Sequence, residues 1–319
     1  MTDQKTFEFE VTEDDLEFKR LDLFLKKSLP DFSRSYIKDL YEKNFISSET
    51  IKLNLKKLPP LGTKIAVIIP EPEKSELIPQ DLNLEILFED EYLLFVNKPA
   101  GMVVHPAPGH WSGTLVNALL FHCNDLQGIG NVERPGIVHR LDKGTSGVMV
   151  VAKEQKTHAA LVNLFKDHDL KREYIALTYG KLFPKKETIE TFIKRDPRNR
   201  QKMSSLVKNG KTAITHYQVL KEFEKSSLVS LVLETGRTHQ IRVHLAQQKR
   251  TSILNDNTYG NPKNHLKSLS GLREVLGDYP HPFLHAKLLS FIHPITGESL
   301  SFETEPPEMF KKVVSFLKK

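Results

Sequence analysis

RPGIVHRLDKGTSGVMVVAK, residues 134–153, is the stretch that decides how this chain folds. An apolar pair precedes Asp142, and the apolar run Val148–Lys153 follows it. The acid is therefore expected on a loop at a strand end, where catalytic groups are common. Glycines at 144 and 147 are expected to let the backbone approach a ligand closely. On this pattern alone, an aspartate in such a turn is more often a structural residue that caps a backbone amide.

Strand-like and helix-like runs alternate irregularly on both sides of this loop. Residues 157–167 have helical spacing, whereas runs rich in β-branched and aromatic residues predict strands; these runs lie at 86–99, 148–153, 172–180, 212–220 and 227–236. Because strict βαβ alternation is absent, we predict an α+β fold with a mixed, mostly antiparallel sheet. Residues 264–282 give no prediction.

The first 70 residues predict a small separate domain. Leu21, Phe24, Leu25 and Leu29 fall on one helix face. A second helix is expected to start after an N-cap at Ser33 and to end near Asn44, followed by a strand at 64–69. Residues 71–80 are rich in Pro and Glu and predict a linker. The predicted organisation is therefore 1–70, a linker at 71–80, and a larger domain at 81–319.

Composition excludes several classes of protein. The chain has 319 residues and one cysteine, so neither a disulfide framework nor a Cys-rich zinc site can form. Cys123 is expected to be a small buried hydrophobe. Although there are 13 histidines, Pro280 and Pro282 flank His281, which argues against a helix that would bring His281 and His285 together, and we predict no metal site. No leader-like or membrane-spanning run is present, so a cytoplasmic protein is expected.

Basic residues are unevenly distributed. The net charge is +6, and residues 181–211 contain 10 Lys/Arg against 3 Asp/Glu. Such a stripe suits a polyanion, because each phosphate contact releases counterions. A solvated basic loop explains the charge equally well.

Residues 139–147, HRLDKGTSG, resemble the motif of the RluA family of pseudouridine synthases. Further blocks resemble the family in the expected order: NKPAGMVVHP (97–106), REYIA (172–176), LETGRTHQIRVHLA (233–246), HAKLLSFIHPITGE (285–298) and FETEPPEMF (302–310). The likeness runs from about Asp81 to the C-terminus and is greatest to the branch called large-subunit ribosomal RNA pseudouridine synthase D. It implies an isomerase that needs no cofactor, acts on ribosomal RNA and works as a monomer.

The resemblance also implies catalytic roles. Asp142 corresponds to the catalytic aspartate, Arg242 to its ion-pair partner and Tyr174 to the active-site tyrosine that stacks on uracil. A carboxylate in a dry pocket needs a cation to stay ionised. We further expect Thr238 to cap the helix that carries Arg242, with His239 and Arg242 on one face. Without the family, Arg242 is read as a surface arginine and Tyr174 as a core tyrosine.

RNA-binding roles are expected for a wider set. Arg140 is expected to fill the space left by a flipped base, with His139 beside it and Ile241 as an apolar wall. Residues 1–70 resemble the S4 RNA-binding domain, on RLD at 20–22 and SRS at 33–35, although the pattern departs after Phe45. The side chains expected to contact the RNA backbone are Arg34, Lys38, Arg195, Arg198 and Arg200.

Three other readings stay open. In the first, the enzyme is the same but its substrate is transfer RNA. In the second, the protein binds RNA and is catalytically silent. In the third, it is a hydrolase that uses Asp142 with His139. The last lacks a recognisable nucleophile elbow at Thr145 and Ser146. The sequence does not choose the modified uridines. It also leaves open whether Asp142 attacks the sugar, abstracts a sugar proton or attacks the base.

Overall fold

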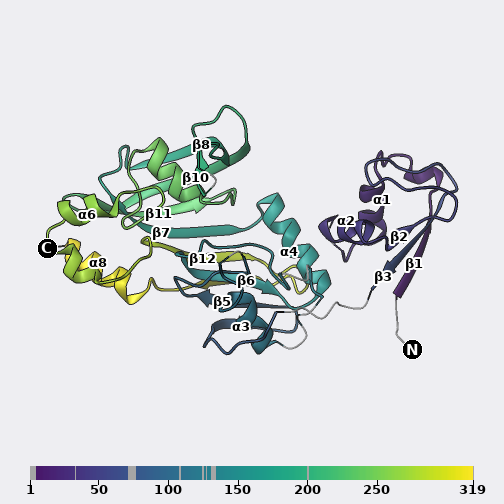
Figure 1. The fold of residues 1–319 in the computed structure, drawn as a ribbon, viewed down its shortest axis with the longest axis horizontal. Helices are drawn as coiled ribbons and strands as arrows, with labels where there is room; N and C mark the ends of the chain where they lie inside the picture. Colours follow the sequence, from purple (N-terminus) through teal and green to yellow (C-terminus); the bar gives the residue numbers. More distant parts are fainter. Residues whose placement is uncertain are drawn as a thin grey trace.

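The computed structural model describes residues 5–318, except for 33, 71–76, 108, 124–125, 127, 131–133 and 200, and leaves the side chain of Ser35 undescribed. The predicted N-cap Ser33 and the RNA-binding candidate Arg200 therefore lie outside the described residues. Two sheets organise the rest: a three-stranded sheet near the N-terminus and a ten-stranded sheet in the larger part of the molecule (Figure 1). No described helix has the length and apolar character needed to cross a membrane.

The N-terminal part is a small sheet packed against two helices. Strands β1 (Lys5–Glu10), β3 (Lys64–Ile69) and β2 (Ile46–Ser47) lie in the order β1-β3-β2, beside η1 (Glu13–Asp15), α1 (Leu21–Ser28) and α2 (Arg34–Glu42). All four apolar residues predicted for one helix face are buried, in a core shared with β1 and β3. The first strand was not predicted, because KTFEFE carries only two apolar side chains, Phe7 and Phe9.

The large sheet confirms the predicted fold class. Its order is β4-β5-β6-β12-β7-β11-β10-β8-β9, with β13 paired to β12. Only the short pairing of β6 with β12 is parallel among the described strand pairs. The strands are β4 (Glu85–Glu89), β5 (Leu93–Lys98), β6 (Ser146–Ala152), β7 (Lys171–Tyr179), β8 (Lys186–Arg195), β9 (Met203–Ser204), β10 (Lys211–Glu222), β11 (Ser226–Leu233), β12 (Leu284–Ile292) and β13 (Ser299–Glu303).

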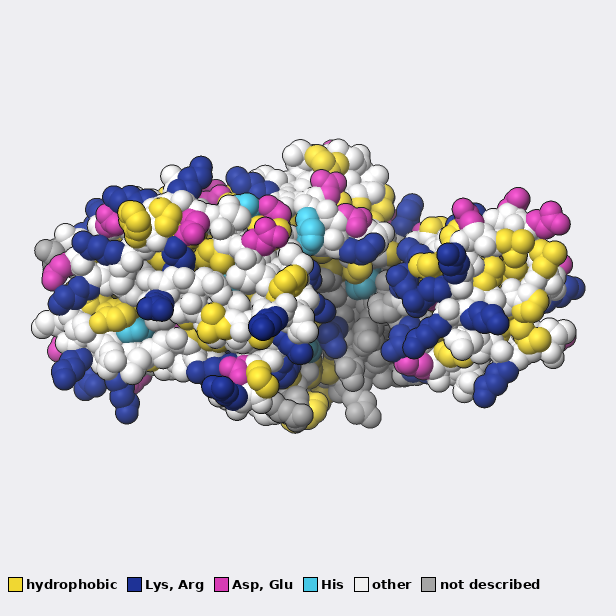
Figure 2. All heavy atoms as spheres, turned by 90° about the horizontal axis from the view of Figure 1, so that it is seen from above, with side chains coloured by type: hydrophobic (Ala, Val, Ile, Leu, Met, Phe, Trp, Pro, Cys, Tyr) yellow, Lys and Arg dark blue, Asp and Glu magenta, His cyan; other side chains and the backbone are white. Residues whose placement is uncertain are grey.

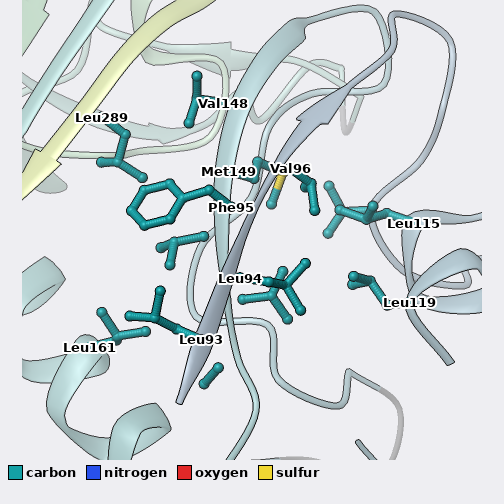
Figure 3. Packing of buried hydrophobic residues seen from close by; sticks show 14 of the residues in the cluster. Leu93, Leu94, Phe95, Val96, Leu115, Leu119, Val148, Met149, Leu161 and Leu289 are labelled. Atoms are coloured by element: carbon teal, nitrogen blue, oxygen red, sulfur yellow. The ribbon is translucent and has the colours of Figure 1, made fainter. Parts of the chain in front are cut away.

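Both faces of the β5 end of this sheet are covered. Strand β5 reads LLFVNK, and its first four side chains are completely buried. Leu94 and its neighbour Val96 point toward α3 (Leu115–His122), whereas Leu93 and Phe95 point toward Leu161 of α4 (Gln155–Asp167) and toward β12 (Figure 3). A strand buried on both faces reads as a continuous apolar run, which explains the composition of β5.

Residues 264–282, for which no structure was predicted, include most of one short helix and the whole of another. They are α6 (Pro262–Ser268) and α7 (Leu272–Leu276). Together with α8 (Glu308–Leu317), they pack on one face of β7, in a core that includes Leu272, Phe283 and Phe310. Helices of five to seven residues lack the repeated spacing that makes a helix visible in sequence.

Candidate active site

A pocket of about 530 Å³ opens where the loop before β6 meets β7 and the segment after β11. That segment contains α5 (Gln240–Val243), which continues into a single π-helical turn, η2 (His244–Gln248). The pocket is lined by Asp142, Arg140, His139, Tyr174, Ile241 and Arg242, among others. Residues predicted from three separate sequence blocks thus meet at one place.

The loop that carries Asp142 is fixed by backbone hydrogen bonds. Nε2 of His139 accepts a hydrogen bond from the backbone N–H of Val150, at 3.1 Å, which ties the loop to β6. The backbone N–H of Gly101 donates to the carbonyl of Lys143, at 2.7 Å. Burial lowers the pKa of His139 to about 3, so this imidazole is neutral and its acceptor nitrogen is available. Asp142 is therefore presented by a loop that is held on both sides.

The glycines of this loop lie in close contact with β12 and with the residues just before it. Gly147 has φ +118°, and a Cβ there would lie 2.1 Å from the carbonyl oxygen of Ala286. A Cβ on Gly144 would lie 2.6 Å from the ring of Pro282. Because β6 and β12 come this close, only glycine fits. The loop is thereby pressed against the strand that follows residues 264–282.

Helix α5 starts differently from the prediction. Its N-cap is His239, in the left-handed conformation with φ 58°, and no side chain caps the helix. The predicted cap, Thr238, lies one residue earlier and lines the pocket instead. His239 is therefore outside the helix, so an i, i+3 spacing does not explain its position. It nevertheless faces the same carboxylate as Arg242, with Nε2 at 3.8 Å from Oδ2 of Asp142.

Gln240 anchors this short helix to the sheet. Its Nε2 donates to the carbonyl of Ile214 and to the hydroxyl of Thr215, each at 2.9 Å, on β10. Its Oε1 accepts from the hydroxyl of Thr235 at 2.8 Å and from the backbone N–H of Arg237 at 3.0 Å. A buried amide with these four hydrogen bonds has its full complement. It holds in place a helix too short to be stable alone.

Arg242 lies between two carboxylates. Its Nη1 donates to Oδ2 of Asp142 at 3.0 Å. On the other side, Nε and Nη2 donate to Oδ2 and Oδ1 of Asp256, at 2.7 and 2.9 Å. Burial favours a higher pKa for Asp256, but the hydrogen bonds and charge of Arg242 outweigh it and lower that pKa. Although burial opposes it, the two carboxylates raise the pKa of Arg242, so the guanidinium stays charged.

Tyr174 lies on β7, and its side chain lines the pocket. Burial raises its pKa to about 12, with the charge of Asp142 acting in the same direction and that of Arg172 against it. The phenol is therefore protonated at neutral pH. It can stack on a nucleobase and can donate or accept a hydrogen bond, but it is not present as a phenolate that could act as a base.

Positive charge dominates the pocket wall. Burial, together with the charges of Arg134 and Arg140, lowers the pKa of His105 to about 4. Among the described lining residues one carboxylate, Asp142, faces six cations, which are Arg134, Arg140, Lys166, Arg172, Arg237 and Arg242. Arg140 is exposed, whereas Ile241 is buried in the wall. A pocket of this charge suits a phosphate-rich ligand.

Arg195 and Arg198 are not brought to the pocket. Arg195 is the last residue of β8, and Arg198 is exposed in the turn that leads toward β9. Neither lines the pocket. Figure 2 shows that Lys and Arg side chains are spread over the face of the molecule that it draws. The described basic residues of 181–211 are exposed, except for the half-buried Lys202, so they form part of the outer surface.

Arg34 and Lys38 lie on α2 of the N-terminal part, each in an ion pair. Arg34 pairs with the largely buried carboxylate of Asp22, which Arg20 also contacts. Lys38 pairs with Glu42 one turn on, at 3.1 Å, and both side chains are exposed. Exposed pairs of this kind are weak, so a phosphate can compete for Lys38 at little cost.

Sequence reasoning missed several residues of the site. Asp256 and Tyr259 lie in NDNTYG (255–260), a polar run without periodicity, which gives no sign of burial. Arg172 lies two residues before Tyr174 in REYIA (172–176), a block that resembles the family, but the sequence analysis predicted a role for the tyrosine alone. Arg172 is 7% exposed, and its Nε has no hydrogen-bond partner among the described residues. Its position in REYIA was the one signal available.

Glu89, His122 and Cys123 form a second cluster, away from this pocket. Their ligand-type atoms lie within 4.8 Å of one another. Glu89 is already paired with His122 and with Lys153, at 2.6 Å each. Cys123 is partly buried, rather than fully buried as expected. We interpret the cluster as an ion-pair network that joins the end of β4 to α3, because Lys153 already supplies the positive charge.

Comparison with known proteins identifies the family. Residues 92–247 match the family model described as RNA pseudouridylate synthase. A protein of Aquifex aeolicus, called an uncharacterized RNA pseudouridine synthase, is 44% identical over 95% of this chain and 96% of its own length. The ribosomal large subunit pseudouridine synthase D of Zymomonas mobilis is 43% identical over 91% of this chain and 90% of its own.

A solved structure agrees with the sequence comparisons. Human RNA pseudouridylate synthase domain containing 4 is 29% identical, has a TM-score of 0.58, and covers 73% of this chain and 93% of its own. The resemblance seen in HRLDKGTSG is thus confirmed, and the chain belongs to the RluA family of RNA pseudouridine synthases, which are isomerases.

Proposed function

We propose that this chain isomerises uridines of large-subunit ribosomal RNA to pseudouridine, with Asp142 as the catalytic residue and without a cofactor. The observation that carries the proposal is the position of one carboxylate, paired with Arg242, in a pocket whose other charged lining residues among those described are Lys and Arg. The reaction breaks the bond from uracil N1 to the ribose, turns the base and rejoins it through carbon 5. No atoms are gained and no redox change occurs, so a carboxylate suffices as nucleophile or base.

The surrounding side chains have roles that follow from their positions. The side chain of Asp142 is 16% exposed, so a target base must leave its stack to reach it. Arg140 is exposed at the same pocket and is suited to fill the vacated space by stacking its guanidinium. Tyr174, protonated at neutral pH, is suited to stack on the flipped uracil. Ile241 supplies an apolar wall.

Large-subunit ribosomal RNA is proposed as the substrate because of the names of two relatives that match nearly the whole chain. The proteins of Zymomonas mobilis and Neisseria meningitidis are both called ribosomal large subunit pseudouridine synthase D. A cytoplasmic site of action follows from this substrate. The cationic pocket and the basic surface agree with RNA of either class. Transfer RNA is therefore an outcome of the test below.

We also propose that residues 1–70 form an S4-like RNA-binding domain joined by 71–80 to a catalytic domain at 81–319. The N-terminal sheet and helices have a core of their own. Gln80, at the end of the proposed linker, is already hydrogen-bonded to the larger part: its backbone N–H donates to the carbonyl of Asn117 at 3.0 Å. Lys38 and Arg34 lie on α2, which has exposed positions available to a phosphate backbone.

The test is tritium release from RNA labelled at carbon 5 of uridine, because that hydrogen is lost when the new bond forms. Large-subunit ribosomal RNA and transfer RNA transcripts are compared, each with and without chelator. The wild type is compared with Asp142→Asn and with Asp278→Asn, in which an exposed carboxylate is changed. We expect the wild type and Asp278→Asn to react with ribosomal RNA, and Asp142→Asn to be at least about 10³-fold slower.

Each alternative has its own outcome. Release from transfer RNA alone would change the substrate. Release by Asp142→Asn would remove that residue from the mechanism, and loss of release with chelator would contradict a cofactor-free reaction. Tight RNA binding without release from any transcript, including assembly intermediates, would indicate a silent RNA-binding protein.

A further inference from the structure

The segment 255–260, NDNTYG, lies directly behind the Asp142–Arg242 pair. It follows the isolated bridge between Ile253 and Thr178 and ends before α6. Two of its side chains, Asp256 and Tyr259, point back toward the pocket wall and contact Arg242 and His239, respectively. Asp256 is completely buried. The catalytic mechanism proposed above uses neither residue.

Asp256 determines which nitrogen of Arg242 faces Asp142. It accepts hydrogen bonds from Nε and Nη2, and this leaves Nη1 for Oδ2 of Asp142. A guanidinium is planar, so holding two of its nitrogens fixes the direction of the third. Asp256 is itself held, because its Oδ1 accepts the backbone N–H groups of Thr258 at 2.8 Å and Tyr259 at 3.1 Å.

Tyr259 is placed to set which nitrogen of His239 carries the proton. The Tyr259 hydroxyl accepts a hydrogen bond from the backbone N–H of Met203 at 2.7 Å, so its own proton is free to be donated to Nδ1 of His239 at 2.8 Å. Burial lowers the pKa of His239, so the ring is neutral and its proton then lies on Nε2. Nε2 is the atom that lies 3.8 Å from Oδ2 of Asp142.

The two arrangements converge on one oxygen atom. Arg242 and His239 both approach Oδ2 of Asp142. The ring of Tyr259 also lies 5.3 Å from the guanidinium carbon of Arg242, which limits movement of that side chain. One turn of the chain therefore supports both nitrogen donors that flank the carboxylate.

We propose that Asp256 and Tyr259 are positioning residues, which act through Arg242 and His239 to hold the carboxylate of Asp142 in its reactive orientation. This inference rests on the proposed catalytic role of Asp142. It predicts that the two residues affect the rate of the chemical step and leave RNA affinity unchanged. It also predicts that the hydroxyl of Tyr259 has no effect of its own once His239 is absent.

The experiment compares Asp256→Asn, Tyr259→Phe and the matched control Asn257→Ala, which changes an exposed residue of the same turn. Single-turnover tritium release gives the rate, and equilibrium binding of the same RNA gives the affinity. We expect rates lower by about 10²-fold for Asp256→Asn and about 10-fold for Tyr259→Phe, since small misplacements of reacting groups are costly. RNA affinity is expected to stay within about twofold of wild type, as for the control.

A second comparison separates positioning from folding. In a His239→Asn background, adding Tyr259→Phe is expected to lower the rate by less than about twofold, because the two residues act in series. Thermal unfolding of each variant, followed by circular dichroism, shows which of them are folded. If Asp256→Asn does not fold, Tyr259→Phe alone tests the proposal, because this variant keeps the aromatic ring and removes only one hydroxyl group.

The inference is overturned if a folded Tyr259→Phe protein reacts as fast as Asn257→Ala. It is also overturned if the rate falls only as far as RNA affinity falls, or if Tyr259→Phe keeps its full effect in the His239→Asn background. A failure of the proposed function is recognised by different results in the tritium-release assay. In that case the wild type releases no tritium, or Asp142→Asn reacts as fast as the wild type, whatever happens at 256 and 259.

Discussion

Lys98 is a buried cation whose titration makes the stability of this protein depend on pH. It is the last residue of β5, its side chain is completely buried, and Nζ donates to the carbonyls of Pro99 at 2.9 Å and Met102 at 3.0 Å. Burial lowers the pKa of Lys98 from 10.5 to about 7, and the charge of Asp142 opposes this shift only in part. In the unfolded chain the amine titrates near its ordinary value.

The sign and size of the effect follow from these two values. Below about pH 7 the lysine is protonated in both states, and folding carries the full cost of burying the charge. Between about pH 7 and about pH 10.5 the unfolded chain holds a proton that the folded chain has lost, so stability rises with pH. The free energy of unfolding should increase by about 2 kcal/mol from about pH 7 to about pH 9 on account of Lys98 alone.

The assay is urea unfolding of the wild type and of Lys98→Met at both pH values, followed by far-UV circular dichroism. Methionine keeps the apolar length of the side chain and removes the titrating group. Other groups titrate in both proteins, so we compare the free energy of unfolding of the wild type with that of Lys98→Met at each pH. This difference should change by about 2 kcal/mol in favour of the wild type as the pH rises. Lys312→Met, at an exposed position of α8, should show no such change. A difference that is constant over this pH range would refute the reasoning, because it would mean that Lys98 keeps one protonation state throughout.

Three further predictions concern other parts of the site. Arg242→Met should lower the free energy of unfolding by about 3–5 kcal/mol, because it leaves the carboxylate of Asp256 buried without a partner; urea unfolding measures this, and wild-type stability would contradict it. Gly147→Ala should lower the free energy of unfolding by more than about 3 kcal/mol, because its Cβ would lie 2.1 Å from the carbonyl oxygen of Ala286. Thermal unfolding tests this, and a melting temperature equal to that of the wild type would show that β6 and β12 can separate. Arg140→Ala should weaken RNA binding by about 10-fold and reduce the slope of log affinity against log salt by about 1, as measured by titration at several salt concentrations; an unchanged slope would mean that Arg140 contacts no phosphate.

Local sequence patterns predicted much of the framework. The helix face that carries Leu21 and Phe24 and the helix that carries Leu161 repeat apolar side chains at a helical period, and β5 is marked by a short continuous apolar run. The mostly antiparallel α+β fold followed from their order along the chain. The loop that carries Asp142 was also placed correctly, before a buried strand, because apolar runs and turn residues mark it from both sides.

Patterns failed where an element was short or where a residue was held by its partners. Strand β1 carries two apolar side chains, and α6 and α7 are too brief to repeat a face. Thr238 was predicted to cap α5, but the helix starts at a left-handed His239, and its anchor is a buried glutamine bonded to another strand. The close contacts of Gly144 with Pro282 and of Gly147 with Ala286 of β12 left no sign in the sequence.

The sequence by itself determined the family, the fold class and the aspartate on which the proposed chemistry depends. Only the tertiary structure decided what surrounds that aspartate. Arg242 is 100 residues away along the chain and reaches Asp142 because α5 is anchored to β10. Asp256 and Tyr259 come from a polar turn with no pattern of its own, and they matter because the fold buries them behind that pair. Short-range periodicity reports backbone conformation, but the pairing of buried polar groups depends on long-range packing.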